Sequence, residues 1–157
     1  PCKCGLYGTD RCRRSPQAVD KYLSRLSGPL LDRIDLYVEV PALDFDQLSR
    51  RSDAEPSAVI KARVNAARAI QTARFGPEGP DCNAHMGQTE LARFCRLDEA
   101  GTALIKGAFD RMGLTARSYD RILRVARTIA DLDGAENIGV DHLAEAIQYR
   151  ESSSLRR

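Results

Sequence analysis

Three cysteines lie close together near the N-terminus, in the pattern Cys2-x-Cys4 followed by Cys12. Thiolates at this spacing can share a zinc ion, but a structural zinc site needs four ligands. No fourth ligand is adjacent, because the residue two positions beyond Cys12 is Arg14. The segment is therefore either an incomplete zinc site or a set of free thiols in a flexible loop.

The other cysteines are scattered along the chain. Cys82 or His85 could complete the zinc set from a remote loop, although the sequence does not show that they approach it. The total of five cysteines is odd, and no signal-peptide pattern precedes them. These features favour a reducing cytoplasm.

A single arginine, Arg33, follows the short rigid turn Gly28-Pro29 and precedes an alternating segment. A guanidinium in this position can project outward and reach a phosphate held by a neighbouring subunit. The alternative is that Arg33 pairs with Asp32 or Asp35 in a surface ion pair that contributes little stability.

A second set of arginines, Arg117, Arg121 and Arg124, is spaced by four and then three residues. On a helix these side chains line one face, where like charges repel unless an anion or acidic side chains neutralise them. Asp120 and Asp131 are the acids that could answer them in part. The alternative is a solvated charged face.

No complete active site is visible in the 157 residues. The sequence has no G-x-x-x-x-G-K-[ST] loop, no acidic strand end of the Walker B kind and no H-E-x-x-H motif. His85 and His142 are far apart, without partners that suggest a catalytic dyad.

The composition is that of a soluble globular protein, with 43% hydrophobic and 29% charged residues. No apolar run is long enough for a membrane span, so we expect no membrane partner. The net charge of +2 does not by itself imply nucleic acid. Of the 24 basic residues 20 are arginine, which suits phosphate binding but would also follow from a high-GC genome.

The first elements that position these residues are a helix and a strand. Ser15-Pro16 is an N-cap followed by proline at the first helical position, which predicts a helix there. Residues 35–40 alternate, with Leu36, Val38 and Val40 on one face, and predict a strand. A lone strand cannot satisfy its own backbone, so it must pair with strands outside this chain or with a second copy. Together with a start at Pro1 rather than Met, this favours a piece of a longer protein.

The remaining chain predicts helices. A short one is expected around 45–51, and five more fall at about 56–74, 87–95, 98–112, 115–132 and 139–150. The helix at 56–74 has an expected buried stripe of Ile60, Val64, Ala67 and Ile70 or Gln71, and the helix at 98–112 carries Ala103, Leu104, Ala108 and Phe109. The predicted fold class is mainly α, a bundle of about five helices preceded by the helix and strand of an α/β remnant. The expected division is a core remnant at 1–41, a linker at 42–55, a helical lid at 56–150 and a tail at 151–157.

These features occur together, in order, in one family: the chain resembles the C-terminal part of the magnesium-chelatase-like AAA+ ATPases of bacteria, the YifB/ComM competence proteins. The stretches that carry the resemblance cover nearly the whole chain. They are Pro1-Cys2-x-Cys4-Gly5, Ser15-Pro16, Arg25–Asp35, Asn83-Ala84, Cys95-x-Leu97, Leu114–Arg121, Ile122–Asp133 and His142–Arg150.

The resemblance implies a parent protein with an N-terminal Lon-protease-like domain, Walker A and B motifs, bound ATP and Mg²⁺, and assembly with copies of itself into a ring. It implies that Arg33 is the arginine finger acting on the neighbouring subunit and that Arg117 is the sensor-2 arginine of the lid. Arg124 is a further candidate for nucleotide contact. Family members usually show a second Cys-x-Cys, whose last position is Arg14 here, so the zinc site formed by Cys2, Cys4 and Cys12 is weakened.

The resemblance also implies a motor that acts on DNA, driving branch migration during natural transformation, and a chain that does not hydrolyse ATP alone. Two alternatives stay open. One is the motor subunit of a magnesium-chelatase-type complex that inserts metal into a tetrapyrrole. The other is a plain helical interaction module.

Overall fold

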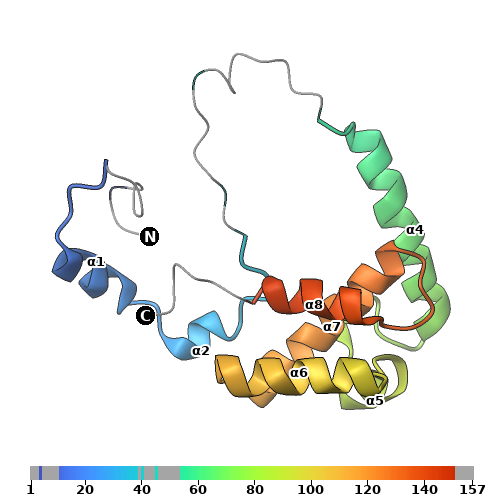
Figure 1. Cartoon of the computed structure of the whole chain (residues 1–157). Helices are drawn as coiled ribbons and strands as arrows, with labels where there is room; N and C mark the ends of the chain where they lie inside the picture. Colours follow the sequence, from blue (N-terminus) through green and yellow to red (C-terminus); the bar gives the residue numbers. More distant parts are fainter. Residues whose placement is uncertain (1–3, 5–10, 39, 41–44, 46–53, 151–157) are drawn as a thin grey trace.

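The computed structural model describes residues 4, 11–38, 40, 45 and 54–150. In this part of the chain seven α-helices and one 3-10 turn follow one another (Figure 1). They are α1 (Pro16–Leu23), α2 (Gly28–Leu31), α4 (Ser57–Phe75), η1 (Asn83–His85), α5 (Gln88–Phe94), α6 (Glu99–Met112), α7 (Ala116–Leu132) and α8 (Val140–Gln148). The mainly α fold class and the five helices of the bundle are confirmed.

Local capping explains where most of these helices begin and end. The side chains of Ser15, Ser27, Asp98 and Thr115 each accept a hydrogen bond from a backbone N–H in the first turn of α1, α2, α6 and α7. Gly113 ends α6 in the left-handed conformation, with φ of 59°, which a residue with a Cβ rarely adopts.

Helix α7 lies at the centre of the bundle and packs against α4, η1, α5 and α8, while α6 packs against α8. Its Ile122 and Ala126 are fully buried, as is Leu143 of α8. One continuous hydrophobic core joins them to side chains of α5 and α6. No helix in the described ranges has the length and apolar character needed to cross a membrane.

Two of the predicted buried faces are confirmed only in part. In α4, Ala67 and Gln71 are buried as expected, whereas Ile60 and Val64 are 41% and 46% exposed. The cause is visible in Figure 1, where the first part of α4 extends beyond the bundle. In α6, Ala108 is buried and Leu104 packs against the core as expected, whereas Phe109 is exposed and Gly101 and Ile105 complete the buried face.

The predicted strand is not formed in the residues that the structure describes from this segment, 35–38 and 40. The N–H of Tyr37 in this segment donates to the carbonyl of Tyr149, the residue after α8, at 2.8 Å. Leu36, Val38 and Val40 are exposed. A ladder needs a second strand to accept the remaining N–H groups, and the described residues supply none. The helix expected at 45–51 lies outside the described residues apart from Phe45.

A buried ionic network joins α4, η1 and α7 behind the core. The carboxylate of Asp131 accepts hydrogen bonds from Arg74 at 2.8 Å, from Arg127 at 3.1 Å and from Asn83 at 2.7 Å. Arg127 also donates to the carbonyls of Glu136 and Ala135. Burial by itself would raise the pKa of Asp131, but the hydrogen bonds from Arg74 and Asn83 and the nearby positive charges outweigh burial and lower it.

Replacing Asp131 with asparagine should destabilise the fold by about 3 kcal/mol, because the buried guanidinium of Arg127 and the partly buried one of Arg74 lose their counter-charge. A native pKa below the unfolded one means that Asp131 stabilises the fold above the unfolded pKa of about 4, and that this stabilisation is lost as the pH falls further. Urea unfolding between pH 7 and pH 3 should therefore show a shallower acid dependence in Asp131→Asn.

The matched control is Asp133→Asn, which removes a carboxylate that is 63% exposed and pairs only at the surface with His142. We expect this variant to change the unfolding free energy by less than about 1 kcal/mol. Equal losses in the two variants would contradict the role given to the buried network.

Candidate functional site

Arg33 follows directly after α2, in a segment held by local capping. Ser27 caps α2 by accepting from the N–H of Leu30 at 3.3 Å, and the N–H of Arg33 donates to the carbonyl of Leu30 at 3.0 Å. The side chain of Arg33 is exposed, and its guanidinium has no ion-pair or hydrogen-bond partner among the described residues. This arginine therefore presents a free cation.

The two carboxylates that flank Arg33 face other partners. Asp32 accepts hydrogen bonds from the hydroxyl of Thr115 at 3.3 Å and from that of Ser118 at 3.2 Å, both at the start of α7. Asp35 forms an ion pair with Arg121. The surface pair between Arg33 and Asp32 or Asp35 is therefore not formed, and the alternative based on it is wrong.

Arg150 holds this segment against the lid. Its side chain is 1% exposed and lies 3.8 Å from the carboxylate of Asp32, donates to Ser118 Oγ at 3.1 Å and donates to the carbonyl of Ile34. The guanidinium also lies over the ring of Tyr37, at 5.5 Å from its centroid. We call Asp32, Ser118 and Arg150 the clasp. It fixes the residues on both sides of Arg33 to the start of α7 and the end of α8.

Arg117 is the second residue of α7 and immediately precedes Ser118 of the clasp. Its side chain is exposed and, like that of Arg33, has no hydrogen-bond or ion-pair partner among the residues that the structure describes. The backbone around it is fixed, because Thr115 caps the helix by accepting from the N–H of Ser118 at 3.2 Å. Both predicted phosphate-contacting arginines thus have free guanidinium groups, and each is adjacent in sequence to a residue of the clasp.

The remaining arginines of the predicted charged face are engaged. Arg124 donates two hydrogen bonds to the carbonyl of Met86, at 3.1 and 2.8 Å, which fixes it against η1. The acidic side chains that were expected to neutralise this face contact other groups instead. Asp120 accepts from Gln88 at 2.6 Å, and Asp131 belongs to the buried network. Arg124 is therefore poorly placed for a phosphate, and its contact with nucleotide stays a prediction.

The N-terminal thiols are partly described. Cys4 Sγ and Cys12 Sγ lie 3.5 Å apart, which is compatible with two ligands of one metal ion, whereas Cys2 is outside the described residues. Within the described chain, Cys82 and His85 do not join this pair but group with Asp81. The expectation that one of them completes the N-terminal set is therefore not supported by the geometry.

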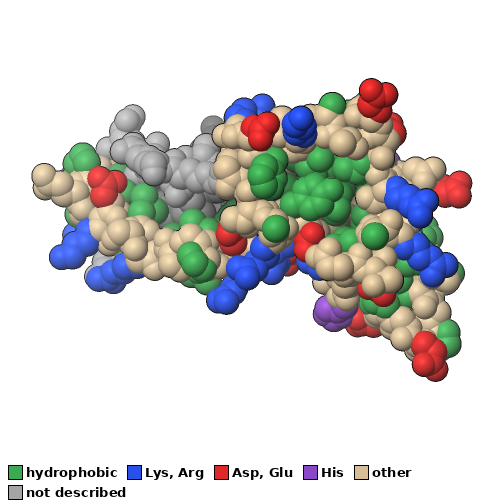
Figure 2. All heavy atoms as spheres, turned by 90° about the horizontal axis from the view of Figure 1, so that it is seen from below, with side chains coloured by type: hydrophobic (Ala, Val, Ile, Leu, Met, Phe, Trp, Pro, Cys, Tyr) green, Lys and Arg blue, Asp and Glu red, His purple; other side chains and the backbone are tan. Residues whose placement is uncertain are grey.

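An apolar groove of about 380 Å³ lies between residues 35–36, α7 and α8. Its two carboxylates are already engaged, since Asp35 pairs with Arg121 and Glu145 accepts from the hydroxyl of Tyr149. Figure 2 shows how hydrophobic side chains reach the surface between charged ones on the face seen from below. The groove therefore suits apolar contact better than acid–base chemistry.

The clasp makes a prediction about local stability. In Asp32→Asn, hydrogen exchange of the backbone amides at residues 33–38 should accelerate about tenfold or more, because a charge-assisted contact to buried Arg150 is lost. Exchange in the middle of α7 should stay unchanged.

The control is Asp35→Asn, which removes a carboxylate three residues away that pairs with Arg121 at the surface. Exchange in this variant should change much less than in Asp32→Asn. The role of the clasp would be refuted by equal acceleration in both variants.

The comparisons with known proteins match two consecutive parts of the chain to one family. Residues 54–150 match the family described as magnesium chelatase, subunit ChlI C-terminal, and residues 1–48 match magnesium chelatase, subunit ChlI. Competence protein ComM of Haemophilus influenzae is 42% identical over 96% of this chain. The protein YifB of Escherichia coli, described as uncharacterized, is 39% identical over the same share. An uncharacterized protein of Mycobacterium tuberculosis is 35% identical over 99%.

This chain covers 29% of the length of ComM and YifB and 31% of the mycobacterial relative. The similar region therefore covers nearly all of this chain but less than a third of each relative. The family match spans the whole lid, and the resemblance expected from the sequence is confirmed. The chain belongs to the magnesium chelatase subunit ChlI C-terminal family and is similar along nearly its whole length to part of the ComM and YifB proteins.

Proposed function

We propose that this chain is the arginine-finger and lid portion of a ring-forming AAA+ ATPase motor that acts on DNA. The observation that carries the proposal is the hydrogen bond of 3.2 Å between Ser118 and Asp32. This hydrogen bond connects the residue before Arg33 to the residue after Arg117. The backbone segments that carry the two free guanidinium groups are therefore held together.

The proposed roles follow from the charge distribution in phosphoryl transfer. Negative charge spreads over the transferred phosphoryl group, and fixed cations that meet it lower the barrier. Arg33 would reach the nucleotide of the neighbouring subunit, and Arg117 would contact the nucleotide of its own subunit. ATP and Mg²⁺ would be held mainly by Walker motifs, which the printed sequence does not contain. Alone, the chain is therefore expected to be inactive.

The action on DNA is proposed from the relative that is named a competence protein. The match to magnesium chelatase subunit ChlI favours a second candidate, a motor for metal insertion into a tetrapyrrole. The two differ in what stimulates the ATPase of the parent protein. Single-stranded or branched DNA should stimulate the DNA motor, whereas the second candidate needs a partner that carries a metal-binding domain. A plain helical interaction module would show no nucleotide dependence at all.

Arg33→Ala and Arg117→Ala in the full-length parent should each lower ATPase turnover, by about a thousandfold and a hundredfold respectively, because a cation is lost where charge develops. Steady-state phosphate release measures this. The matched control is Arg96→Ala, since Arg96 is also exposed and its side chain donates to the carbonyl of Ala92 in the preceding helix, α5. Wild-type turnover in both Arg33→Ala and Arg117→Ala would refute the roles.

A subunit-mixing experiment tests whether Arg33 acts across the boundary. A subunit with an inactive Walker B motif still carries Arg33, and an Arg33→Ala subunit still carries an intact nucleotide site. Mixed rings should therefore recover activity that neither variant has alone. No recovery from mixed rings, with assembly verified by light scattering, would mean that Arg33 does not act in trans.

A further inference from the structure

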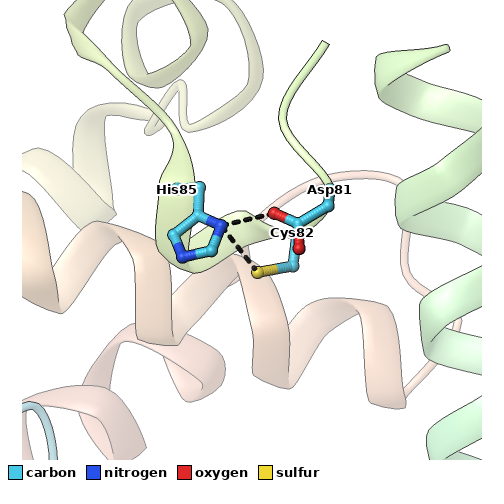
Figure 3. Close-up of side chains that lie close together, drawn as sticks. All are labelled: Asp81, Cys82 and His85. Carbon is cyan, nitrogen blue, oxygen red and sulfur yellow. Dashed lines mark hydrogen bonds and ion pairs between the residues drawn. The ribbon is translucent and has the colours of Figure 1, made fainter. Parts of the chain in front are cut away.

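A second group of chemically active side chains lies outside the clasp, at the start of η1 (Figure 3). Asp81, Cys82 and His85 each present one ligand atom, and these atoms lie within 4.8 Å of one another. Cys82 Sγ is 3.8 Å from His85 Nδ1, and the same nitrogen contacts Asp81 Oδ1. A thiol, an imidazole and a carboxylate therefore converge on one point.

These three groups are the ligand types that zinc takes in proteins. In a tetrahedral zinc site, with Zn–S of about 2.3 Å and Zn–N of about 2.0 Å, the sulfur and nitrogen are separated by about 3.6 Å. The separation of 3.8 Å between Cys82 Sγ and His85 Nδ1 is close to this value. Binding requires the carboxylate of Asp81 to move away from His85 Nδ1, because these two atoms are in hydrogen-bond contact and would be about 3.3 Å apart as ligands of one tetrahedral zinc ion. His85 binds as the tautomer that carries its proton on Nε2.

The backbone that carries these ligands is anchored from behind. Asn83, between Cys82 and His85, is 1% exposed; its N–H donates to Gln71 and its side chain bonds Asp131 and Arg74. Met86, directly after His85, is 2% exposed, and its carbonyl accepts both hydrogen bonds of Arg124. The turn is held in place while its ligands point outward, which limits the entropy lost on binding.

Access for a metal ion is open. The side chains of His85 and Asp81 are 66% and 68% exposed. Three protein ligands leave a fourth tetrahedral position for water, as in open zinc sites. We propose that Asp81, Cys82 and His85 form a three-ligand binding site for Zn²⁺ on the surface of the lid.

The alternative is an ion pair between His85 and Asp81, four residues apart in sequence, beside an unrelated thiol. The two interpretations differ in the role of Cys82, which the ion pair does not require. Cys95 supplies an internal comparison, because it is buried and burial raises the pKa of its thiol to about 11. A thiol of this kind is a poor metal ligand at neutral pH.

The experiment uses the whole chain with Cys2→Ser, Cys4→Ser and Cys12→Ser, so that the N-terminal thiols cannot bind. Titration with Co²⁺, a spectroscopic probe for zinc sites, should saturate at one equivalent and give thiolate-to-cobalt charge-transfer absorption. Zn²⁺ should displace the cobalt and bleach this absorption. In the same background, Cys82→Ser should abolish the charge-transfer band, and Asp81→Asn or His85→Asn should weaken binding at least tenfold.

Glu78→Gln is the matched control, since it removes an exposed carboxylate from the same loop without removing a proposed ligand. It should leave the cobalt affinity unchanged. A measurement that does not depend on these variants follows alkylation of Cys82 by iodoacetamide with mass spectrometry. Zn²⁺ should protect Cys82, and a chelator should restore its reactivity.

Three results would overturn the proposal. They are no charge-transfer band in the triple-serine background, a band that persists in Cys82→Ser, and alkylation of Cys82 at the same rate with and without Zn²⁺. Any of them would leave the Asp81–His85 contact as an ion pair only.

Discussion

The arrangement of the lid depends on the burial of one carboxylate, that of Asp131. A buried carboxylate is tolerated only when cations and hydrogen-bond donors surround it, and Arg74, Arg127 and Asn83 meet this need from α4, α7 and η1. Because the three donors come from separate elements, satisfying the charge also fixes these elements relative to one another. The single 3-10 turn η1 is too short to be stable alone, and the hydrogen bonds of this network fix its position.

A second buried charge, that of Arg150, fixes the N-terminal segment to the lid. Arg150 is held between Ser118 and the carbonyl of Ile34, although Ile34 and Arg150 are 116 residues apart in sequence. Without a strand partner, residues 34–38 have few other means of attachment, so this contact replaces the ladder that the sequence pattern led us to expect. The segment that carries Arg33 is therefore attached to the lid through Arg150.

The elements could be predicted from the sequence because their signals are local. Thr115 and Gly113 specify a helix start and a helix end through contacts within a few residues. The wrong assignments concern contacts between distant segments. Asp131 was expected to answer the exposed arginines of α7 but points inward, and its spacing of four from Arg127 was the one signal for this pair. Asp32 and Arg150 are too far apart in the sequence for a spacing pattern to indicate their contact, so the clasp could be found only from the structure.

The same distinction explains why two of 20 arginines stand out. Exposure alone does not select them, since Arg13, Arg14 and Arg25 are exposed as well. Arg33 and Arg117 differ because each adjoins a residue of the clasp, so the backbone that carries it is fixed before any phosphate arrives. A guanidinium on a fixed backbone needs little reorganisation to stabilise negative charge that develops on a phosphate. A guanidinium on a mobile loop must first be ordered. The proposed phosphate roles of Arg33 and Arg117 therefore rest on the fixed backbone that carries them, which Asp32, Ser118 and Arg150 hold in place.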